Sequence, residues 1–146
     1  MSKPEEDLLA GIRVLLRIFT VDETRFPPAE GRIKYNAIDF QALYFIAENS
    51  DCSGAALAGF LGVPATTAQS VIERLIHRGY VARRSGTGRA IALSLSKEGQ
   101  SVCAAIRRQD ISNCGTMLGA LPEDERSDFA EKIRLIAQAL ESAETE

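Results

Sequence analysis

The feature that most constrains the fold is a pair of short helical patterns separated by a brief break. Residues 54–61 are small or apolar, and Gly62 follows them as a residue suited to the left-handed conformation that ends many helices. Pro64 then opens a second helical pattern, because a missing N–H group costs nothing in a first helical turn. The second pattern runs to about Arg78 and ends at Gly79. Two short helices joined by a glycine-containing turn predict a helix-turn-helix.

The second helix of the pair is amphipathic. Its apolar positions recur at helical spacing and predict a buried face made of Ala68, Val71, Ile72, Leu75 and Ile76. The polar side chains left pointing outward in its first turns are those of Thr66, Thr67, Gln69 and Ser70. Short hydroxyl side chains at a helix start also cap backbone N–H groups, so this pattern alone is typical of an ordinary helix start as well.

A small β-hairpin is predicted directly after the helix-turn-helix. Residues 80–83 and 90–95 read as strands, and residues 85–89 between them are rich in glycine and lack a bulky apolar side chain. Ser96 is placed to cap a long helix that runs to about Leu118, with Gly99 as an unusual early member. Helix, turn, helix and hairpin together predict a winged helix-turn-helix.

Three further helices complete the prediction. The first spans about residues 4–24, and the second spans residues 37–48 with Asn36 as its N-cap. The second helix is apolar almost all round, so we expect it to be central and buried. The last helix starts near residues 121–125, where acids suit the helix dipole, and continues through Leu140. The predicted fold class is mainly α with a small β-hairpin wing.

Charge is distributed unevenly along the chain. The formal net charge is −3. Residues 63–97 nevertheless hold six basic residues against one acid, a local net charge of +5, whereas residues 110–146 hold nine acids against three basic residues, a local net charge of −6. A local basic face is what binding to a phosphate backbone requires, and the overall charge hides it.

Composition excludes several classes of protein. The 146 residues allow one domain with a modest core. No apolar run approaches the roughly 20 residues of a membrane span, and the polar start carries no signal peptide, so we expect a cytoplasmic protein with no membrane partner. Three scattered cysteines and one histidine predict neither a disulfide framework nor a metal site or cofactor. Catalytic motifs are absent, so we expect no enzyme.

Three stretches carry a resemblance to a known family. They are residues 58–64 (AGFLGVP), 71–81 (VIERLIHRGYV) and 89–99 (RAIALSLSKEG). In this wording and in helix order the chain resembles the MarR family of transcription regulators. The resemblance implies one domain over residues 1–146, with a DNA-binding lobe at about 36–97. It also implies dimerisation helices at about 4–25 and 98–143.

The resemblance and the residue chemistry together predict binding to double-stranded DNA. A helix fits the major groove, where glutamine can bond adenine and a threonine methyl can pack on thymine. Arg89 occupies the hairpin tip, the position from which the family's wing arginine enters the minor groove. Arg74 is placed to contact phosphates or acids within the fold. The predicted DNA-binding residues are Thr66, Thr67, Gln69, Ser70, Arg74, Arg83, Arg84 and Arg89.

The chain departs from the family pattern at the DNA-binding residues. Ala65 and Ser70 stand where members often carry an arginine, and Thr87 stands where many have an aspartate that braces the wing arginine. We therefore expect a more mobile wing, and base specificity cannot be transferred from other members.

The helices at the two chain ends carry apolar stripes that bear on assembly. Apolar stripes at residues 8, 12, 15, 19 and at 129, 133, 136, 140 pack either within one chain or between two, and the resemblance implies a homodimer. It also implies a small aromatic or phenolic effector, for which the candidate pocket residues are Arg13, Phe19, Phe40, Tyr44 and Ile106.

Cys52 is a redox candidate, because a position just before a helix N-terminus can lower a thiol pKa.

The predicted function is a sequence-specific DNA-binding regulator, a ligand-responsive repressor acting as a homodimer. The alternative from another class is a protein-interaction module whose winged helix has lost operator binding. A metal-sensing winged helix is a further alternative, against which the shortage of histidine and cysteine clusters counts.

Overall fold

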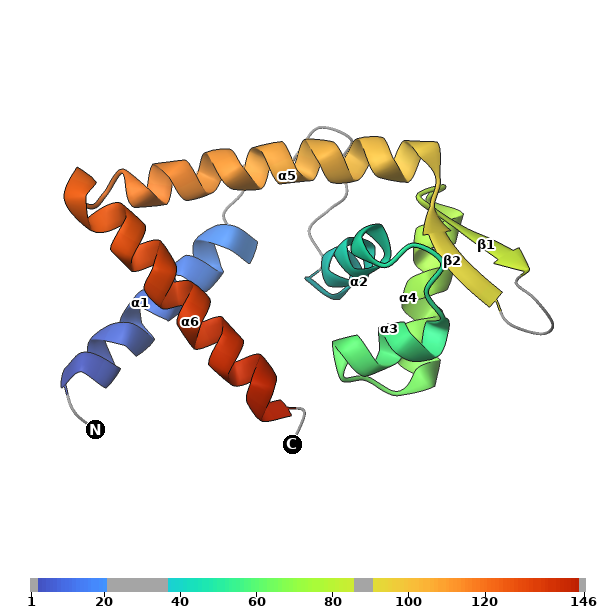
Figure 1. The fold of residues 1–146 in the computed structure, drawn as a ribbon, viewed down its shortest axis with the longest axis horizontal. Helices are drawn as coiled ribbons and strands as arrows, with labels where there is room; N and C mark the ends of the chain where they lie inside the picture. Colours follow the sequence, from blue (N-terminus) through green and yellow to red (C-terminus); the bar gives the residue numbers. More distant parts are fainter. Residues whose placement is uncertain (1–2, 21–36, 86–90, 145–146) are drawn as a thin grey trace. The chain divides into compact units, whose positions relative to one another are not determined.

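The computed structural model describes residues 3–20, 37–85 and 91–144 (Figure 1). Contacts divide the chain into two compact units, Met1–Gln109 and Asp110–Glu146, and the boundary falls within one long helix. The elements in chain order are α1 (Lys3–Thr20), α2 (Ala37–Glu48), α3 (Gly54–Leu61), α4 (Ala65–His77), β1 (Val81–Ser85), β2 (Ile91–Leu95), α5 (Lys97–Leu118), the 3-10 turn η1 (Glu123–Glu125) and α6 (Arg126–Glu144).

The predicted fold class is confirmed: the described chain is mainly helical with one two-stranded antiparallel sheet. The bounds of α2 and α3 agree with those predicted from the sequence. α1 is described to Thr20, so the rest of its predicted range and the predicted cap Asn36 lie outside the described residues. The last helix differs in its start, because the acidic residues 123–125 form a 3-10 turn and α6 begins only at Arg126.

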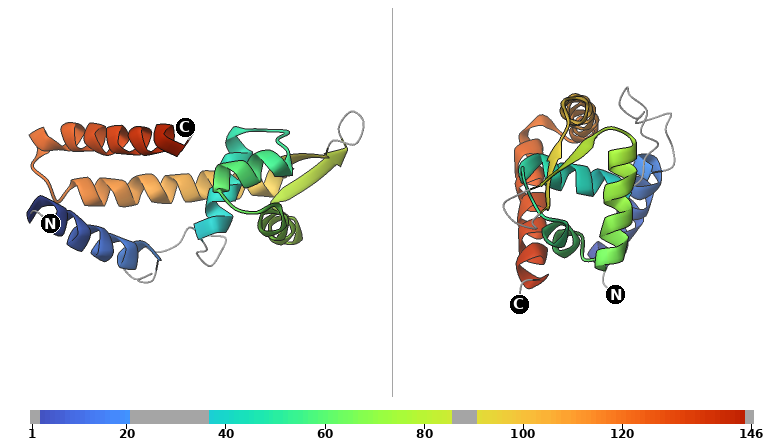
Figure 2. Two further views of the ribbon diagram at one scale, coloured as in Figure 1. Left: turned by 90° about the horizontal axis from the view of Figure 1, so that it is seen from below. Right: turned by 90° about the vertical axis from the view of Figure 1, so that its right-hand side faces the viewer.

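The helix-turn-helix forms through local interactions. The Ser53 side chain accepts a hydrogen bond from the backbone N–H of Ala56 (3.0 Å), which caps α3 as expected. Gly62 takes the left-handed conformation at φ 70° and ends α3. α4 then starts directly after Pro64, and the two helices meet at 110°, a steep crossing that Figure 2 shows. The break in the sequence is therefore the turn of the motif.

One core lies beneath α2, α3, α4 and the hairpin. These elements contact one another and lie on one side of the N-terminal half of α5 (Figure 1). α2 is central, as predicted, since it contacts α3, α4 and β2. The side chains that form this core are those of Phe40, Ala42, Leu43, Ile46, Leu57, Val71, Ile72, Leu75, Tyr80, Val81, Leu93 and Ile106.

The hairpin is longer at its first strand than predicted and has an additional partner. β1 continues to Ser85, and its register pairs Val81 with Leu95 and Ser85 with Ile91. The turn before α3 joins the sheet as well, because the backbone N–H of Leu93 donates to the carbonyl oxygen of Cys52 at 2.8 Å. This bond anchors the base of the wing to the start of the helix-turn-helix.

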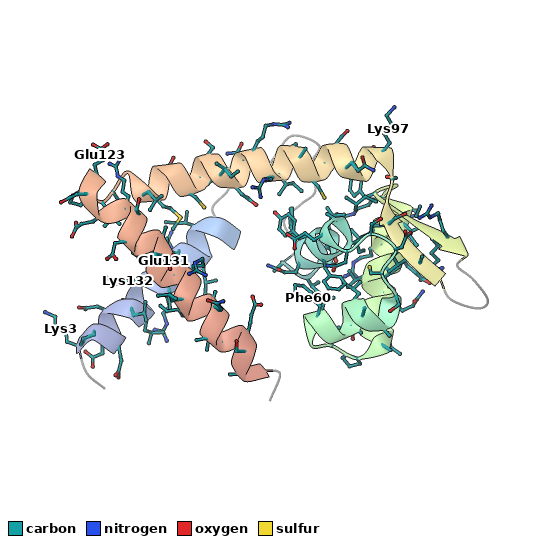
Figure 3. The ribbon with its side chains drawn as sticks, in the orientation of Figure 1. Lys3, Phe60, Lys97, Glu123, Glu131 and Lys132 are labelled. Atoms are coloured by element: carbon teal, nitrogen blue, oxygen red, sulfur yellow. The ribbon has the colours of Figure 1, made fainter. Side chains whose placement is uncertain are left out.

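Gly99 is explained by the crossing of α5 over the start of β1. Ser96 caps α5 as predicted: its hydroxyl accepts from the N–H of Gly99 (3.0 Å) and donates to the carbonyl oxygen of Gly79 (2.6 Å). A Cβ atom at position 99 would stand 2.0 Å from the carbonyl oxygen of Tyr80, which no real contact allows. Lys97 projects outward from the same first turn (Figure 3). Only glycine permits this close approach.

The two terminal helices leave apolar side chains uncovered. In α1, the side chains of Leu8, Ile12 and Leu15 are exposed. In α6, the exposed apolar side chains are those of Phe129, Ile133, Leu135, Ile136 and Leu140. α6 also carries ion pairs along its own length, Lys132 with Asp128 (2.5 Å) and Arg134 with Glu131 (2.6 Å).

Candidate nucleic-acid interface

α4 separates the predicted base-reading residues from the core. The side chains of Ala68, Val71, Ile72 and Leu75 are buried. The polar side chains of the outward face, those of Thr66, Thr67, Gln69 and Ser70, are all exposed. A helix in the major groove needs this separation, because only exposed side chains can reach base edges.

Two of these polar side chains are already hydrogen-bonded within the helix. The Ser70 hydroxyl donates to the carbonyl oxygen of Thr66 at 3.2 Å, one turn earlier. The side-chain amide of Gln69 donates to a carboxylate oxygen of Glu73 at 3.1 Å, one turn later. Serine and threonine hydroxyls often bond the preceding turn in this way, and they remain available to solvent and ligands.

Arg74 forms an ion pair with a buried acid of α2. Its guanidinium donates through Nη2 to Asp39 Oδ1 (2.7 Å) and through Nε to Oδ2 (3.3 Å), a two-pronged geometry that fits a carboxylate. The side chain of Asp39 is 1% exposed and that of Arg74 is 43% exposed. The hydrogen bond from Arg74 to Asp39 raises the pKa of Arg74, so the guanidinium group stays charged. Of the two roles considered for Arg74, the structure shows the internal one.

The two described arginines of the wing lie near acids. Arg83 Nη2 is 3.9 Å from Glu73 Oε1, and Arg84 forms an ion pair with Asp51 in the turn before α3. All four side chains are exposed, so these pairs contribute at most about 1 kcal/mol each. The basic surface predicted from the sequence is therefore partly neutralised by acids that fold next to it.

The hairpin tip lies outside the described residues. Arg89, the predicted minor-groove arginine, and Thr87, the departure from the family pattern, both belong to it. Their expected roles rest on the sequence alone.

The predicted effector residues fall into three groups. Phe40 and Ile106 are buried in the core, and half-buried Tyr44 packs against that core with its ring centroid 6.3 Å from that of Phe40. Arg13 is exposed on α1. The side chain of Phe19 lies outside the described residues. The structure thus brings three of the five candidates into one cluster.

The pKa of the Cys52 thiol is shifted in the direction opposite to the one that its place before a helix favours. Burial raises the pKa of the Cys52 thiol, with a smaller contribution from the nearby carboxylate of Asp51 and an opposing one from a backbone hydrogen bond. The residue is half-buried because its backbone pairs with Leu93 of β2. A thiol with a raised pKa holds less thiolate at neutral pH, which is the opposite of the effect expected from a helix N-terminus.

Sequence reasoning missed three acids of this region: Asp39, Asp51 and Glu73. Asp39 carried a usable signal, because it is an acid within a helix that is otherwise apolar nearly all round, and such a charge needs a partner. Asp51 and Glu73 carried none, since exposed acids in turns and on helix faces are usual. Their partners became visible only in the folded chain.

No described helix by itself has the length and apolarity of a membrane span, and one bent pair, α3 with α4, reaches that length and composition only when its two helices are combined. Among the residues the structure describes, no three side chains of His, Cys, Asp or Glu gather as metal ligands would.

Comparison with known proteins finds one matching family model and many solved structures that share the fold. Residues 34–91 match the model of the MarR family. No curated protein sequence matches the chain significantly. The structure of FabT from Streptococcus pneumoniae in complex with DNA has a TM-score of 0.76 at 20% identity, over 97% of this chain and 97% of that chain.

Two further solved structures share the fold. MarR itself has a TM-score of 0.73 at 21% identity, over 91% of this chain and 96% of that chain. A MarR family protein from Mycobacterium tuberculosis in complex with p-aminosalicylic acid has a TM-score of 0.65 at 18% identity, over 90% and 97%. The matched family consists of transcription regulators and not of enzymes. Residues 34–91 therefore match the model of the MarR family, and the chain as a whole has the winged helix-turn-helix fold seen in the structures of FabT and MarR.

Proposed function

We propose that this protein is a sequence-specific DNA-binding transcription regulator that acts as a homodimer, and that it is a repressor whose DNA affinity responds to a small ligand. The observation that carries the proposal is the outward face of α4, whose polar side chains are exposed while the opposite face is buried in the core. The comparison structure of FabT, in complex with DNA, has the same fold.

Base reading is assigned to α4 and phosphate contact to the wing. Gln69 can bond adenine through its amide, and Thr66 and Thr67 can pack methyl groups on thymine. Arg83, Arg84 and the tip residue Arg89 supply positive charge from the hairpin. Phosphate contacts provide affinity and orientation, and base contacts provide the choice of sequence. Arg74 contributes chiefly by holding α4 against α2 through Asp39.

The apolar stripes of the terminal helices support a homodimer. Residues 8, 12, 15, 19 of α1 and 129, 133, 136, 140 of α6 follow the alternating four-and-three spacing of helices that pack along a seam. The described members of both stripes are exposed within one chain. A second copy would cover them, and two helix-turn-helix lobes would then read half-sites about one turn of DNA apart.

An aromatic effector is proposed for the cluster that contains Tyr44 and Phe40. The support is the aromatic contact of these two rings beside Ile106 of α5. A relative with the same fold is in complex with p-aminosalicylic acid. A ligand shifts the balance of DNA-binding and non-binding states only by its difference in affinity for the two, so its effect must appear as a change in DNA affinity.

A protein-interaction module remains the second candidate. The observation that favours it is the pairing of Arg83 and Arg84 with Glu73 and Asp51, which lowers the net positive charge of the surface. Salt dependence separates the two functions. Contacts with phosphate release counterions and weaken steeply with salt, whereas a weak association that does not depend on salt favours the interaction module.

The deciding experiment measures binding of the full chain to the DNA upstream of its own coding sequence, by electrophoretic mobility and by anisotropy across salt concentrations. Arg89→Ala should weaken binding to all sequences and reduce the salt slope by about 1, with Arg108→Ala on α5 as the matched control. Gln69→Ala should change sequence preference, with Gln41→Ala on α2 as its control. If Arg89→Ala binds like the parent at every salt concentration, the wing assignment is wrong.

A further inference from the structure

Glu73 is the one acid on the outward face of α4 in the described structure. It follows Gln69 by one turn and Thr66 by two, so it lies on the same stripe as the residues assigned to base reading. Its side chain is 65% exposed. A negative charge at this place opposes the phosphates of any duplex that approaches α4.

The carboxylate of Glu73 engages two side chains that the proposed function assigns to DNA. The amide of Gln69 donates to Oε1 at 3.1 Å, and Nη2 of Arg83 lies 3.9 Å from the same oxygen. One residue precedes Glu73 on α4 and the other comes from β1. Glu73 therefore links the base-reading helix to the wing in the protein without DNA.

DNA must replace Glu73 as the acceptor for both donors. Phosphate oxygens and base-edge acceptors can accept hydrogen bonds from Gln69 and Arg83. They cannot donate a hydrogen bond to the Glu73 carboxylate, which then lacks a partner. An exocyclic amino group can, and the amino group of cytosine in the major groove is the donor that a glutamate carboxylate recognises. A duplex without such a group leaves a carboxylate unpaired close to phosphates.

We propose that Glu73 is a specificity-determining residue: it holds Gln69 and Arg83 in the free protein and releases them to duplexes that present a cytosine amino group to its carboxylate. This inference rests on the proposed function. It predicts that Glu73 weakens binding to unrelated DNA more than binding to the preferred sequence, because only the preferred sequence satisfies the carboxylate.

The test is a parallel selection from a duplex library whose randomised core spans about 20 base pairs, enough for two half-sites one turn apart. The full-length parent, Glu73→Gln and Glu123→Gln are compared. Glu123→Gln removes the same charge from η1, outside the helix-turn-helix. The parent and Glu123→Gln should enrich a cytosine at one position of each half-site, by roughly tenfold over other bases. Glu73→Gln should lose that preference and bind the unselected library several-fold more tightly.

Two results overturn the inference, and they differ from failure of the proposed function. If the parent enriches a sequence and Glu73→Gln enriches the same one with the same cytosine preference, Glu73 does not determine specificity. If the side-chain amide signal of Gln69 in an ¹⁵N spectrum of the DNA-free protein is unchanged by Glu73→Gln, the link in the free state is absent. If the parent enriches no sequence, the proposed function fails, and the inference fails with it.

Discussion

The helix-turn-helix lobe and the terminal helices differ in how far they bury their apolar side chains. In the lobe, Leu43, Leu57 and Leu75 are completely buried by other residues of the same chain. In α6, Ile133 is 50% exposed and Ile136 is 53% exposed. Full burial of an aliphatic side chain stabilises a fold by about 2 kcal/mol, and the terminal helices leave much of this contribution unrealised within one chain.

This contrast separates two sources of stability. The lobe is closed by contacts within its own chain, so its local packing should be sensitive to single substitutions at buried or close-packed positions. The terminal helices leave apolar side chains exposed within one chain, so if a second copy covers them, their stability should depend on protein concentration.

The largest effect is expected from the double substitution Ile133→Glu and Ile136→Glu on the apolar stripe of α6. Two charges placed in an apolar interface should weaken dimerisation on the order of 100-fold or more. Sedimentation velocity should show a shift from about twice the 15.8 kDa chain mass to that mass.

Leu135→Glu is the matched control for the stripe. Leu135 is 50% exposed, like its neighbours, but it lies off the seam spacing and should leave the dimer intact. A parent that sediments as a monomer, or a double variant with the parent's mass, would contradict the assignment of α6 to a dimer interface.

The second effect concerns Gly99, where α5 crosses β1. Gly99→Ala must displace the Tyr80 carbonyl, which lies 2.0 Å from the added Cβ, and should lower the free energy of unfolding by about 2 kcal/mol or more. Gly115→Ala on the same helix places its Cβ more than 4 Å from every described atom outside its own stretch of helix, and should instead raise the free energy of unfolding by up to about 1 kcal/mol. Urea unfolding at one fixed protein concentration measures both, and equal effects would show that the crossing is not tight.

The third effect compares a buried with an exposed ion pair in the lobe. Arg74→Met leaves Asp39 buried without its partner and should cost about 2 kcal/mol, a value below that of fully buried pairs because Arg74 is partly exposed. Arg84→Met breaks the exposed pair with Asp51 and should change stability by less than about 0.5 kcal/mol. Thermal unfolding followed by circular dichroism measures both. Similar losses in the two variants would refute the special role of Asp39.

The smallest effect is chemical and leaves the fold intact. Burial raises the thiol pKa values of Cys52 and Cys103, whereas Cys114 is exposed on α5. A raised thiol pKa reduces the thiolate fraction at neutral pH, so Cys114 should be alkylated first by iodoacetamide. The rates at Cys52 and Cys103 should continue to rise as the solution is made more alkaline. Mass spectrometry after short pulses resolves the sites, and labelling of Cys52 before Cys114 would contradict the effect of burial.

The sequence predicted the local features of the lobe closely. The bounds of α2 and α3, the cap at Ser53 and the left-handed Gly62 were all found as expected. Each depends on residues within one or two helical turns, so a short window of sequence contains the required information. The exposure of Gln69 and its neighbours followed from the helical period in the same way.

The features of the site that the sequence did not predict involve residues far apart in the chain. The thiol pKa of Cys52 depends on burial beside β2, which follows it by some 40 residues, and not on the helix start next to it. The role of Arg74 depends on Asp39, 35 residues earlier. The apolar surroundings of Asp39 in α2 indicate that its charge needs a partner, but a short window of sequence does not identify which residue that partner is.

The amino-acid sequence by itself determines which segments form helices, where the turn between α3 and α4 lies and which face of α4 is polar. It can do so because backbone conformation and helical period depend on residues close together in the chain. Folding in three dimensions assigns the acids to their arginines, places Glu73 between Gln69 and Arg83, and leaves the stripes of α1 and α6 uncovered. These outcomes depend on which surfaces meet, and burial and electrostatic energies arise only where they do.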